Sequence, residues 1–250
     1  MKKRILIALA VVLAVPVFGV VTLFATREKP DGPRVEAEPG VVGVEAGGAY
    51  AWIVRTPHGA VLVDAGLDAK GVAILAELKA EGVEPDQVVA VLITHGHPDH
   101  YAAAGLFQKA QILVGPGDLA MIRGEKTHYS AFGKMMSALL TLPPGPPAIV
   151  ELRGDEQLEF DGAPFKVIAT PGHSPGSVMY LYKDVLFTGD SLLRKKDGVT
   201  IAPSLMSEDS ERNRVSLRAI EPLAFDKIAD GHAGVAFDAK RKLARFLAGS

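Results

Sequence analysis

The stretch Thr94-His95-Gly96-His97-Pro98-Asp99-His100 holds three histidines and one aspartate within six residues, in a chain with only seven histidines. It directly follows the apolar run 88–93, which predicts a buried strand. A strand that ends in such a cluster presents several imidazole and carboxylate ligands from one turn. These are ligands that suit a borderline cation such as zinc. A single histidine is more often a core or surface residue, but this cluster predicts a metal site.

The spacing His95-x-His97-x-Asp99-His100 resembles the signature of the metallo-β-lactamase fold superfamily, which includes glyoxalase II, lactonases and related hydrolases. The resemblance implies that the remaining ligands are a His, an Asp and a His, each following a strand. His173, Asp190 and His232 fill these positions, each beside a glycine. The resemblance extends from about residue 40 to the end of the chain, and all seven ligand positions are filled.

The resemblance implies an α/β fold, a four-layer αββα sandwich in which helices flank two mixed β-sheets and the metals lie at the edge between the sheets. A weak internal repeat agrees with two such halves. The segments 51–64 and 178–190 are each an apolar strand, a turn, a second apolar strand and an aspartate beside a glycine. Asp64 and Asp190 occupy matching places. Asp64 is either a surface loop residue or, as the resemblance implies, a carboxylate beside the metals that orients a ligand.

The resemblance also implies how the ligands divide between two divalent metal ions. One ion would be held by His95, His97 and His173. The other would be held by Asp99, His100 and His232. Asp190 would bridge the two ions. Zinc is favoured, and the oxygen ligand at the bridge also admits iron or manganese.

Such a centre has a defined chemistry. Two metals about 3.5–4 Å apart can share a hydroxide, because metal binding lowers the pKa of water towards 7. That hydroxide is a nucleophile that needs no serine or cysteine. Asp99 would orient it and pass its proton to the leaving group. Two metals, two carboxylates and one hydroxide sum to a charge of about +1, which favours an anionic substrate or a developing oxyanion.

These features predict a binuclear metal-dependent hydrolase of a small ester, lactone, thioester or amide. A mononuclear iron persulfide dioxygenase using His95, His173 and Asp190 is one alternative, and an exported binding protein without catalysis is another. A metallo-β-lactamase acting on β-lactams is a further alternative, although those enzymes mostly carry Cys or Ser where this chain has Asp190. Only 18 residues follow His232, so the helical substrate domain of glyoxalase II is not expected and glutathione thioesters are disfavoured.

Residues 1–26 are predicted to be a signal peptide or membrane anchor. A basic start precedes an uncharged apolar run over 5–24, which as a helix could cross a bilayer core of about 30 Å. The length of the run favours a retained anchor over a cleaved signal. Either alternative keeps the basic tip in the cytoplasm and exports the rest. The protein would then be anchored in the inner membrane facing the periplasm or exterior, or be periplasmic or secreted after cleavage.

Residues 27–40 contain three prolines and are predicted to be an extended linker, so the hydrolase domain is expected over 41–250. Within that domain a short helix is expected over 101–107, directly after the ligand cluster. Residues 131–142 carry apolar side chains at helical spacing, which favours either a core helix or a lid over the site. Residues 194–196 are predicted to be a solvated basic loop.

Composition limits the classes of partner. The chain has 250 residues, with 27 Lys and Arg against 29 Asp and Glu, and a formal net charge of −2. This balance gives no indication of nucleic-acid binding, so the expected partner is a small-molecule substrate. Cysteine is absent, which excludes disulfides, a thiol nucleophile and a Cys-ligated metal. The oligomeric state is left open by the sequence.

Overall fold

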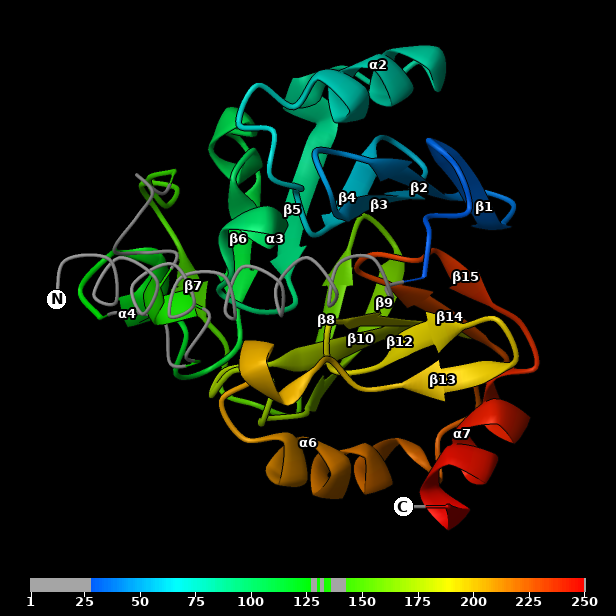
Figure 1. The fold of residues 1–250 in the computed structure, drawn as a ribbon. Coiled ribbons are helices and arrows are strands. Elements are labelled where there is room, and N and C mark those ends of the chain that lie inside the picture. The colour runs from blue at the N-terminus through cyan, green and yellow to red at the C-terminus, as the bar shows by residue number, and fades with distance from the viewer. Residues whose placement is uncertain (1–27, 127–129, 131–132, 136–142, 250) are drawn as a thin grey trace, which may run out of the picture.

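The computed structural model describes residues 28–126, 130, 133–135 and 143–249. Two β-sheets lie face to face, with helices on the outer side of each (Figure 1). The first sheet is covered by α2 (Val72–Ala80) and α3 (Pro98–Tyr101), and the second by α6 (Ser210–Ser216) and α7 (Ala239–Ala248). The predicted α/β fold with two mixed sheets is confirmed.

The first sheet has seven strands, antiparallel from β1 to β4 and parallel from β4 to β7. In spatial order they are β1 (Arg34–Glu38), β2 (Val41–Glu45), β3 (Tyr50–Arg55), β4 (Ala60–Val63), β5 (Val88–Ile93), β6 (Gln111–Val114) and β7 (Val150–Glu151). Strand β5 is apolar throughout and, as predicted, leads into the histidine cluster.

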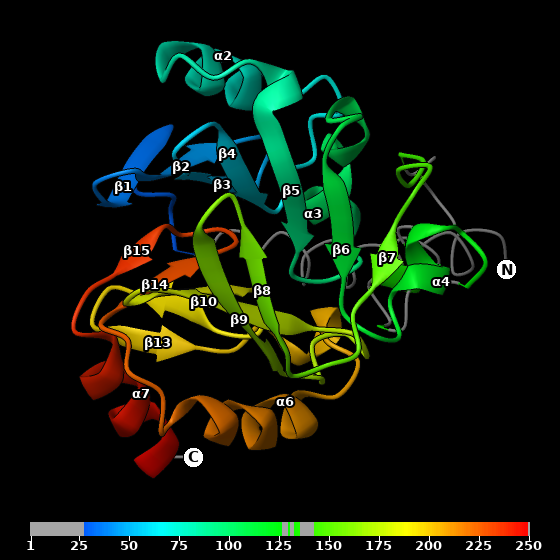
Figure 2. The same ribbon diagram turned by 180° about the vertical axis from the view of Figure 1, so that it is seen from behind.

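The second sheet has six strands, of which only β11 and β14 pair in parallel. Figure 2 shows β8, β9, β10, β14 and β15 of this sheet from behind. In spatial order they are β15 (Val235–Ala236), β14 (Lys227–Asp230), β11 (Val185–Gly189), β10 (Val178–Tyr182), β9 (Ala163–Ala169) and β8 (Gln157–Phe160). A separate small hairpin follows β11 in the chain and consists of β12 (Leu193–Lys195) and β13 (Gly198–Thr200).

The remaining elements are short. They are α4 (Leu119–Ile122) and the 3₁₀ turns η1 (Pro85–Gln87), η2 (Ala104–Leu106), η3 (Ser204–Met206) and η4 (Leu217–Ile220).

Three apolar layers hold the sandwich together. Trp52, Tyr180 and Phe187 lie fully buried between the two sheets. A second layer packs the first sheet against α2 and α3, and a third packs the second sheet against η4 and α7. The Trp52 indole also donates a hydrogen bond of 3.0 Å to the carbonyl of Asp230, so the inter-sheet core is tied to the end of β14.

The internal repeat has a structural counterpart. In each half an antiparallel hairpin is followed by a strand that pairs in parallel with its second strand: β3–β4 with β5, and β10–β11 with β14. Asp64 follows β4 and Asp190 follows β11. The third strand of each half ends two residues before a histidine, β5 before His95 and β14 before His232. The repeat therefore brings chemically similar turns to one edge of the sandwich.

Several predicted boundaries are corrected. The linker expected over 27–40 contains β1, which pairs with β2 and extends the sheet, so the folded part begins before residue 41. The helix expected over 101–107 begins instead at Pro98, whose fixed φ suits the first helical position, and it contains Asp99 and His100. Residues 194–196 belong to the β12–β13 hairpin rather than to a loop, while Lys195 and Lys196 are exposed, as predicted.

The predicted N-terminal signal or anchor, 1–26, lies outside the described residues, as does most of the segment 131–142 for which a core helix or lid is predicted. Within the described ranges no helix combines the length and the apolar character needed to span a membrane.

A surface contact between two turns gives a pH-dependent prediction. Asp161, in the β8–β9 turn, accepts a 2.7 Å hydrogen bond from the His58 amide, and His58 Nδ1 lies 2.6 Å from its other oxygen. Hydrogen bonding from His58 lowers the pKa of Asp161 to about 2, below the ordinary 3.8. The stabilisation is therefore present above about pH 4 and is lost as pH falls through about 2. We expect Asp161→Asn to lower the thermal unfolding temperature at pH 6.

The difference from wild type should shrink as the pH is lowered from 4 towards 2, as followed by circular dichroism. Asparagine tolerates the positive φ of 48° at this position, so backbone strain does not contribute. A difference that stays constant over this pH range would contradict the prediction.

Candidate metal centre

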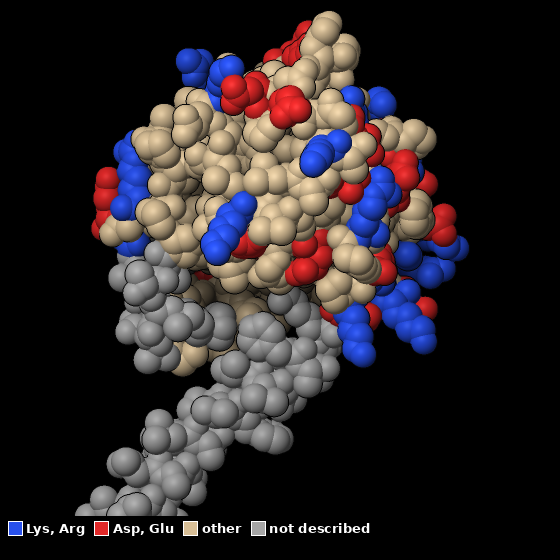
Figure 3. Space-filling model, turned by 90° about the horizontal axis from the view of Figure 1, so that it is seen from above, with Lys and Arg blue, Asp and Glu red and all other residues tan. Residues whose placement is uncertain are grey.

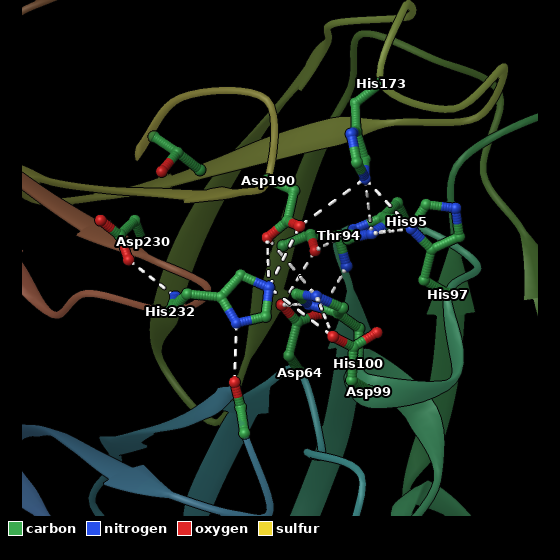
Figure 4. A network of polar contacts seen from close by, with 12 residues as sticks. Asp64, Thr94, His95, His97, Asp99, His100, His173, Asp190, Asp230 and His232 are labelled. Carbon is green, nitrogen blue, oxygen red and sulfur yellow. Dashed lines mark hydrogen bonds and ion pairs between the residues drawn. The ribbon is translucent and has the colours of Figure 1, made fainter. Parts of the chain in front are cut away.

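The seven predicted ligands come together at one edge of the sandwich, where strands of both sheets end (Figure 4). The turn after β5 supplies four of them, and the loop after β9 and the ends of β11 and β14 supply one each. Close packing between these turns explains the glycine before Asp190. Gly189 has a φ of 49°, and a Cβ there would lie 2.4 Å from Thr94 Oγ1. Only glycine allows the end of β11 to approach the end of β5 this closely.

Three histidines form the first group. His95 Nε2 lies 2.9 Å from His97 Nδ1, and His173 Nε2 lies 3.2 Å and 3.1 Å from these two atoms. A tetrahedral ion with bonds of about 2.0–2.1 Å would separate its ligand nitrogens by roughly 3.3 Å. The three nitrogens are therefore spaced as ligands of one such ion. We call these residues the three-His group.

The second group consists of Asp99, His100 and His232. Asp99 Oδ2 lies 3.8 Å from His100 Nε2 and 3.6 Å from His232 Nε2. We call these residues the Asp-His-His group. It contains one hard oxygen ligand and two imidazoles, a set that suits zinc, iron or manganese.

Asp190 lies between the two groups. Its Oδ1 is 3.0 Å from His232 Nε2 and 3.6 Å from His100 Nε2, while its Oδ2 is 3.7 Å from His173 Nε2. One carboxylate therefore reaches ligands of both groups, as a bridging ligand must.

The residues fit a cation on a further observation. His100 is fully buried, and its Nδ1 contacts Asp64, but its Nε2 has no hydrogen-bond partner among the described residues. A buried polar nitrogen without a partner is costly unless something coordinates it. His100 Nε2 points into the space between Asp99 and Asp190, where a metal ion would satisfy it.

Asp64 contacts His100 directly and reaches His95 through Thr94, whose Oγ1 lies 3.1 Å from His95 Nδ1. Its Oδ1 accepts a 2.8 Å bond from the Thr94 amide, and its Oδ2 contacts Thr94 Oγ1 at 2.8 Å and His100 Nδ1 at 2.7 Å. It is 1% exposed, so the alternative of a surface loop residue is wrong. The structure places Asp64 where the resemblance implied, against the outer nitrogen of a ligand histidine, which fixes the orientation of that ring.

Other supporting residues were not predicted. Ser207 Oγ lies 3.2 Å from His173 Nδ1, and the Gly48 carbonyl lies 2.7 Å from His232 Nδ1. Asp230 Oδ1 accepts a 2.7 Å bond from the His232 amide. Asp230 directly precedes the Gly-His turn at a strand end, which could have marked it. Ser207 and Gly48 are distant in sequence from their histidines and carry no local signal.

The ionisation of the groups follows from burial and charge. Burial lowers the pKa of His95 well below its ordinary value and that of His173 to about 4, so both rings are in the neutral, metal-binding form. In the metal-free site burial acts in the same direction on His100, but Asp64 and then Asp99 outweigh it and raise its pKa to about 10, so an ion bound at Nε2 would displace a proton. Burial opposes ionisation of Asp190, yet His232 and His100 hold its pKa well below the usual range.

The glycine before His232 gives a further prediction. A Cβ on Gly231 would lie 2.7 Å from Asp190 Oδ1 and 2.8 Å from His100 Cε1. We expect Gly231→Ala to destabilise the protein by about 1–3 kcal/mol through overpacking and to reduce its metal content. Urea unfolding and elemental analysis measure the two effects.

Gly198→Ala in β13 is the matched control, because a Cβ there would meet nothing within 4 Å. Equal stability and metal content in the two variants would show that the site can absorb the extra methyl group, contrary to the prediction.

The family follows from fold and site together. The fold is an αββα sandwich, and at the edge between its two sheets lies a cluster of His and Asp residues that could hold metal ions. The model of the metallo-beta-lactamase superfamily matches residues 44–232, which include every predicted ligand. The chain belongs to the metallo-beta-lactamase superfamily.

Curated relatives support this membership. Metallo-beta-lactamase domain-containing protein 1 of Xenopus laevis is 33% identical over 177 residues, which are 69% of this chain and 65% of that protein. Hydroxyacylglutathione hydrolase of Albidiferax ferrireducens is 33% identical over 151 residues, which are 57% of this chain and 47% of that enzyme. The chain therefore covers less than two thirds of the length of either relative.

Solved structures show the same fold. A metallo-beta-lactamase family protein from Thermus thermophilus superposes with a TM-score of 0.69 at 22% identity, over 86% of this chain and 80% of that one. The metallo-beta-lactamase SMB-1 gives a TM-score of 0.66 at 22% identity, over 89% of this chain and 95% of that one. At this identity the likeness concerns architecture alone.

Proposed function

We propose that this protein is a binuclear metal-dependent hydrolase of a small ester, lactone, thioester or amide. The observation that carries the proposal is the position of Asp190, whose Oδ2 lies 3.1 Å from His232 Nε2 and 3.7 Å from His173 Nε2, so one carboxylate reaches both groups. A carboxylate in this place is the element that a two-metal site requires beyond two separate ligand groups. Membership of a superfamily whose members include hydroxyacylglutathione hydrolase supports the reaction class.

When bound, a pair of divalent ions, with zinc favoured, would supply a water of lowered pKa and a Lewis acid for the substrate carbonyl. The residues of the chain have separate roles. Three of the histidines are fully buried and would hold the ions in fixed positions: His95, His100 and His173. The Asp99 side chain is 32% exposed, so it is the carboxylate that can exchange a proton with substrate at its Oδ2.

The charge of the metal centre and the distribution of charged residues on the surface limit the class of substrate. Two carboxylates, Asp99 and Asp190, do not neutralise two divalent ions, so an anionic substrate is favoured. The face of the described chain drawn in Figure 3 intermixes Lys and Arg with Asp and Glu rather than gathering basic residues. This distribution favours a small molecule over a nucleic acid.

The test is metal stoichiometry together with a substrate panel. The chain is purified without chelator, its metals are measured by elemental analysis, and turnover is assayed with lactones, thioesters, esters and β-lactams. We expect two zinc ions per chain and hydrolysis of at least one carbonyl substrate. One iron per chain with oxygen consumption on persulfides would replace the proposal with the dioxygenase alternative. No metal after addition of zinc would overturn it.

We further propose that residues 5–24 direct export and tether the enzyme to the inner membrane, with the metal centre on the outer side. The support is the uncharged apolar run behind a basic tip. Fusion of alkaline phosphatase to the C-terminus should give an active reporter in the membrane fraction. A cytoplasmic, inactive reporter would contradict the proposal.

A further inference from the structure

A buried aspartate outside the ligand set joins two of the ligand turns. Asp118 directly precedes α4 and is fully buried. Its Oδ2 accepts hydrogen bonds from the Gly96 amide at 2.7 Å and from Ser174 Oγ at 2.6 Å. Its Oδ1 accepts a bond from the Gly176 amide at 2.8 Å. Three donors from two separate loops therefore converge on one carboxylate.

These donors lie beside the three-His group. Gly96 lies between His95 and His97, and Ser174 directly follows His173. The two turns are far apart in the chain. Among the described residues, side-chain hydrogen bonds of Asp118 link them, in addition to the contacts between the three histidines. The packing around it leaves no spare room, because a Cβ on Gly176 would lie 2.7 Å from the Asp118 amide nitrogen.

The Asp-His-His group is held by other carboxylates. Asp64 contacts His100 Nδ1 at 2.7 Å, and Asp230 accepts the amide of His232 at 2.7 Å. Asp230 also accepts hydrogen bonds from the amides of Ala233 and Arg194, which fixes the whole turn. Within the described ranges, no hydrogen bond joins Asp118 to residues 98–100 or 230–234. Asp64 also reaches His95 through Thr94 Oγ1, whereas the hydrogen bonds of Asp118 go only to the turns of the three-His group.

We propose that Asp118 is a positioning residue for the three-His group, setting the metal affinity of that group and leaving the affinity of the Asp-His-His group unchanged. The inference rests on the proposed binuclear function. Without the carboxylate, the turn of His95 and His97 and the turn of His173 can move apart, and the separation of 3.1 Å between His173 Nε2 and His97 Nδ1 is no longer held. Loss of such an outer partner costs about 10–100-fold in metal affinity.

The variant Asp118→Asn tests this with little change in volume. An Asn has one acceptor oxygen, and its NH₂ group would face an amide N–H of Gly96 or Gly176 that then has no acceptor. The variant is combined with two backgrounds that each remove one ligand. His232→Ala weakens the Asp-His-His group and leaves the three-His group as the main site, while His173→Ala does the reverse.

The measurement is the zinc dissociation constant of the full chain, purified in mild detergent, stripped of metal and titrated against a chromophoric chelator. In the His232→Ala background we expect Asp118→Asn to raise this constant by about 10–100-fold. In the His173→Ala background we expect a change of less than about twofold. Because the readout is metal affinity, no substrate is needed.

Asp230→Asn is the matched control, since it removes a buried carboxylate of the same kind beside the other group. It should show the opposite pattern, with the larger loss in the His173→Ala background. Equal losses for Asp118→Asn in both backgrounds would mean general destabilisation and would overturn the inference, as would no loss in either background.

If Asp118→Asn does not fold, as judged by circular dichroism of the metal-free protein, Ser174→Ala replaces it. This variant removes one of the three donors and keeps the carboxylate. We then expect a several-fold loss of affinity confined to the His232→Ala background, and a loss in both backgrounds or in neither would overturn the inference. Failure of the wild type to bind two metals would overturn the proposed function as well, whereas two metals in the wild type with an unselective Asp118→Asn would overturn this inference alone.

Discussion

Asp190→Ala is expected to lower kcat/KM by more than about a hundredfold and to reduce the metal content from two ions per chain to one or none. Loss of a residue that only supports a metal ligand costs up to about a hundredfold in metal affinity or activity. Because Asp190 directly faces both groups of ligands, its loss should cost more. The variant removes the carboxylate that lies 3.0 Å from His232 Nε2 and 3.7 Å from His173 Nε2. Steady-state kinetics on the best substrate of the panel and elemental analysis of the same preparation measure the two effects.

Asp86→Ala is the control for this experiment. Asp86 lies in η1, and its exposed carboxylate pairs only with exposed Lys109 at 2.7 Å among the described residues. Its removal should leave turnover and metal content unchanged. If Asp190→Ala kept both metals and full turnover, the bridging position of Asp190 would have no role and the binuclear proposal would fail.

Asp64→Asn is expected to destabilise the metal-free protein by about 3–5 kcal/mol near pH 6, the cost of removing one partner of a buried ion pair. The carboxylate is 1% exposed and contacts His100 Nδ1 at 2.7 Å and the Thr94 amide at 2.8 Å. In the variant, the amide NH₂ faces a donor, so at least one buried group loses its partner. Urea unfolding in the presence of chelator measures the free energy of unfolding.

The effect of this variant should depend on pH. Burial opposes the charged ring, but Asp64 and Asp99 raise the pKa of His100 from 6.5 to about 10. Because the folded pKa lies above the ordinary value, the stabilisation is fully present below about pH 6.5 and is lost as pH rises through about 10. The difference between wild type and Asp64→Asn should therefore be largest at pH 6 and smaller at pH 10. A difference that grows with pH would contradict the charge assignment.

The sequence alone predicted the family, the two mixed sheets and the seven residues that meet at the site. The reason is that these features depend on residues that are adjacent in the sequence. Strand β5 is a continuous apolar run with the boundaries predicted for it, and four of the ligands follow it within one turn. The other three each stand beside a glycine after an apolar strand. Such patterns depend on neighbouring residues, so they can be recognised without a tertiary structure.

Two elements were missed although the nearby sequence bears on them. The helix beginning at Pro98 could have been predicted from proline at a first helical position, and β1 lies in a segment whose prolines favoured a linker. Strand β1 forms because it pairs with the edge of β2. The hairpin that contains residues 194–196 is held by Arg194, which contacts Asp31 at 2.8 Å and the Ala233 carbonyl at 2.8 Å. These pairings join residues distant in sequence.

Only the tertiary structure decided which residues hold the ligands in place. Asp118 is bonded to turns 22 and 56 residues away, and Ser207 contacts a histidine 34 residues before it. An isolated aspartate or serine carries no periodicity and no motif, since its role depends on which loops the folded chain brings against it. The sequence thus determined which His and Asp residues gather at the site, while the packing of the two sheets determined which buried carboxylates contact their turns.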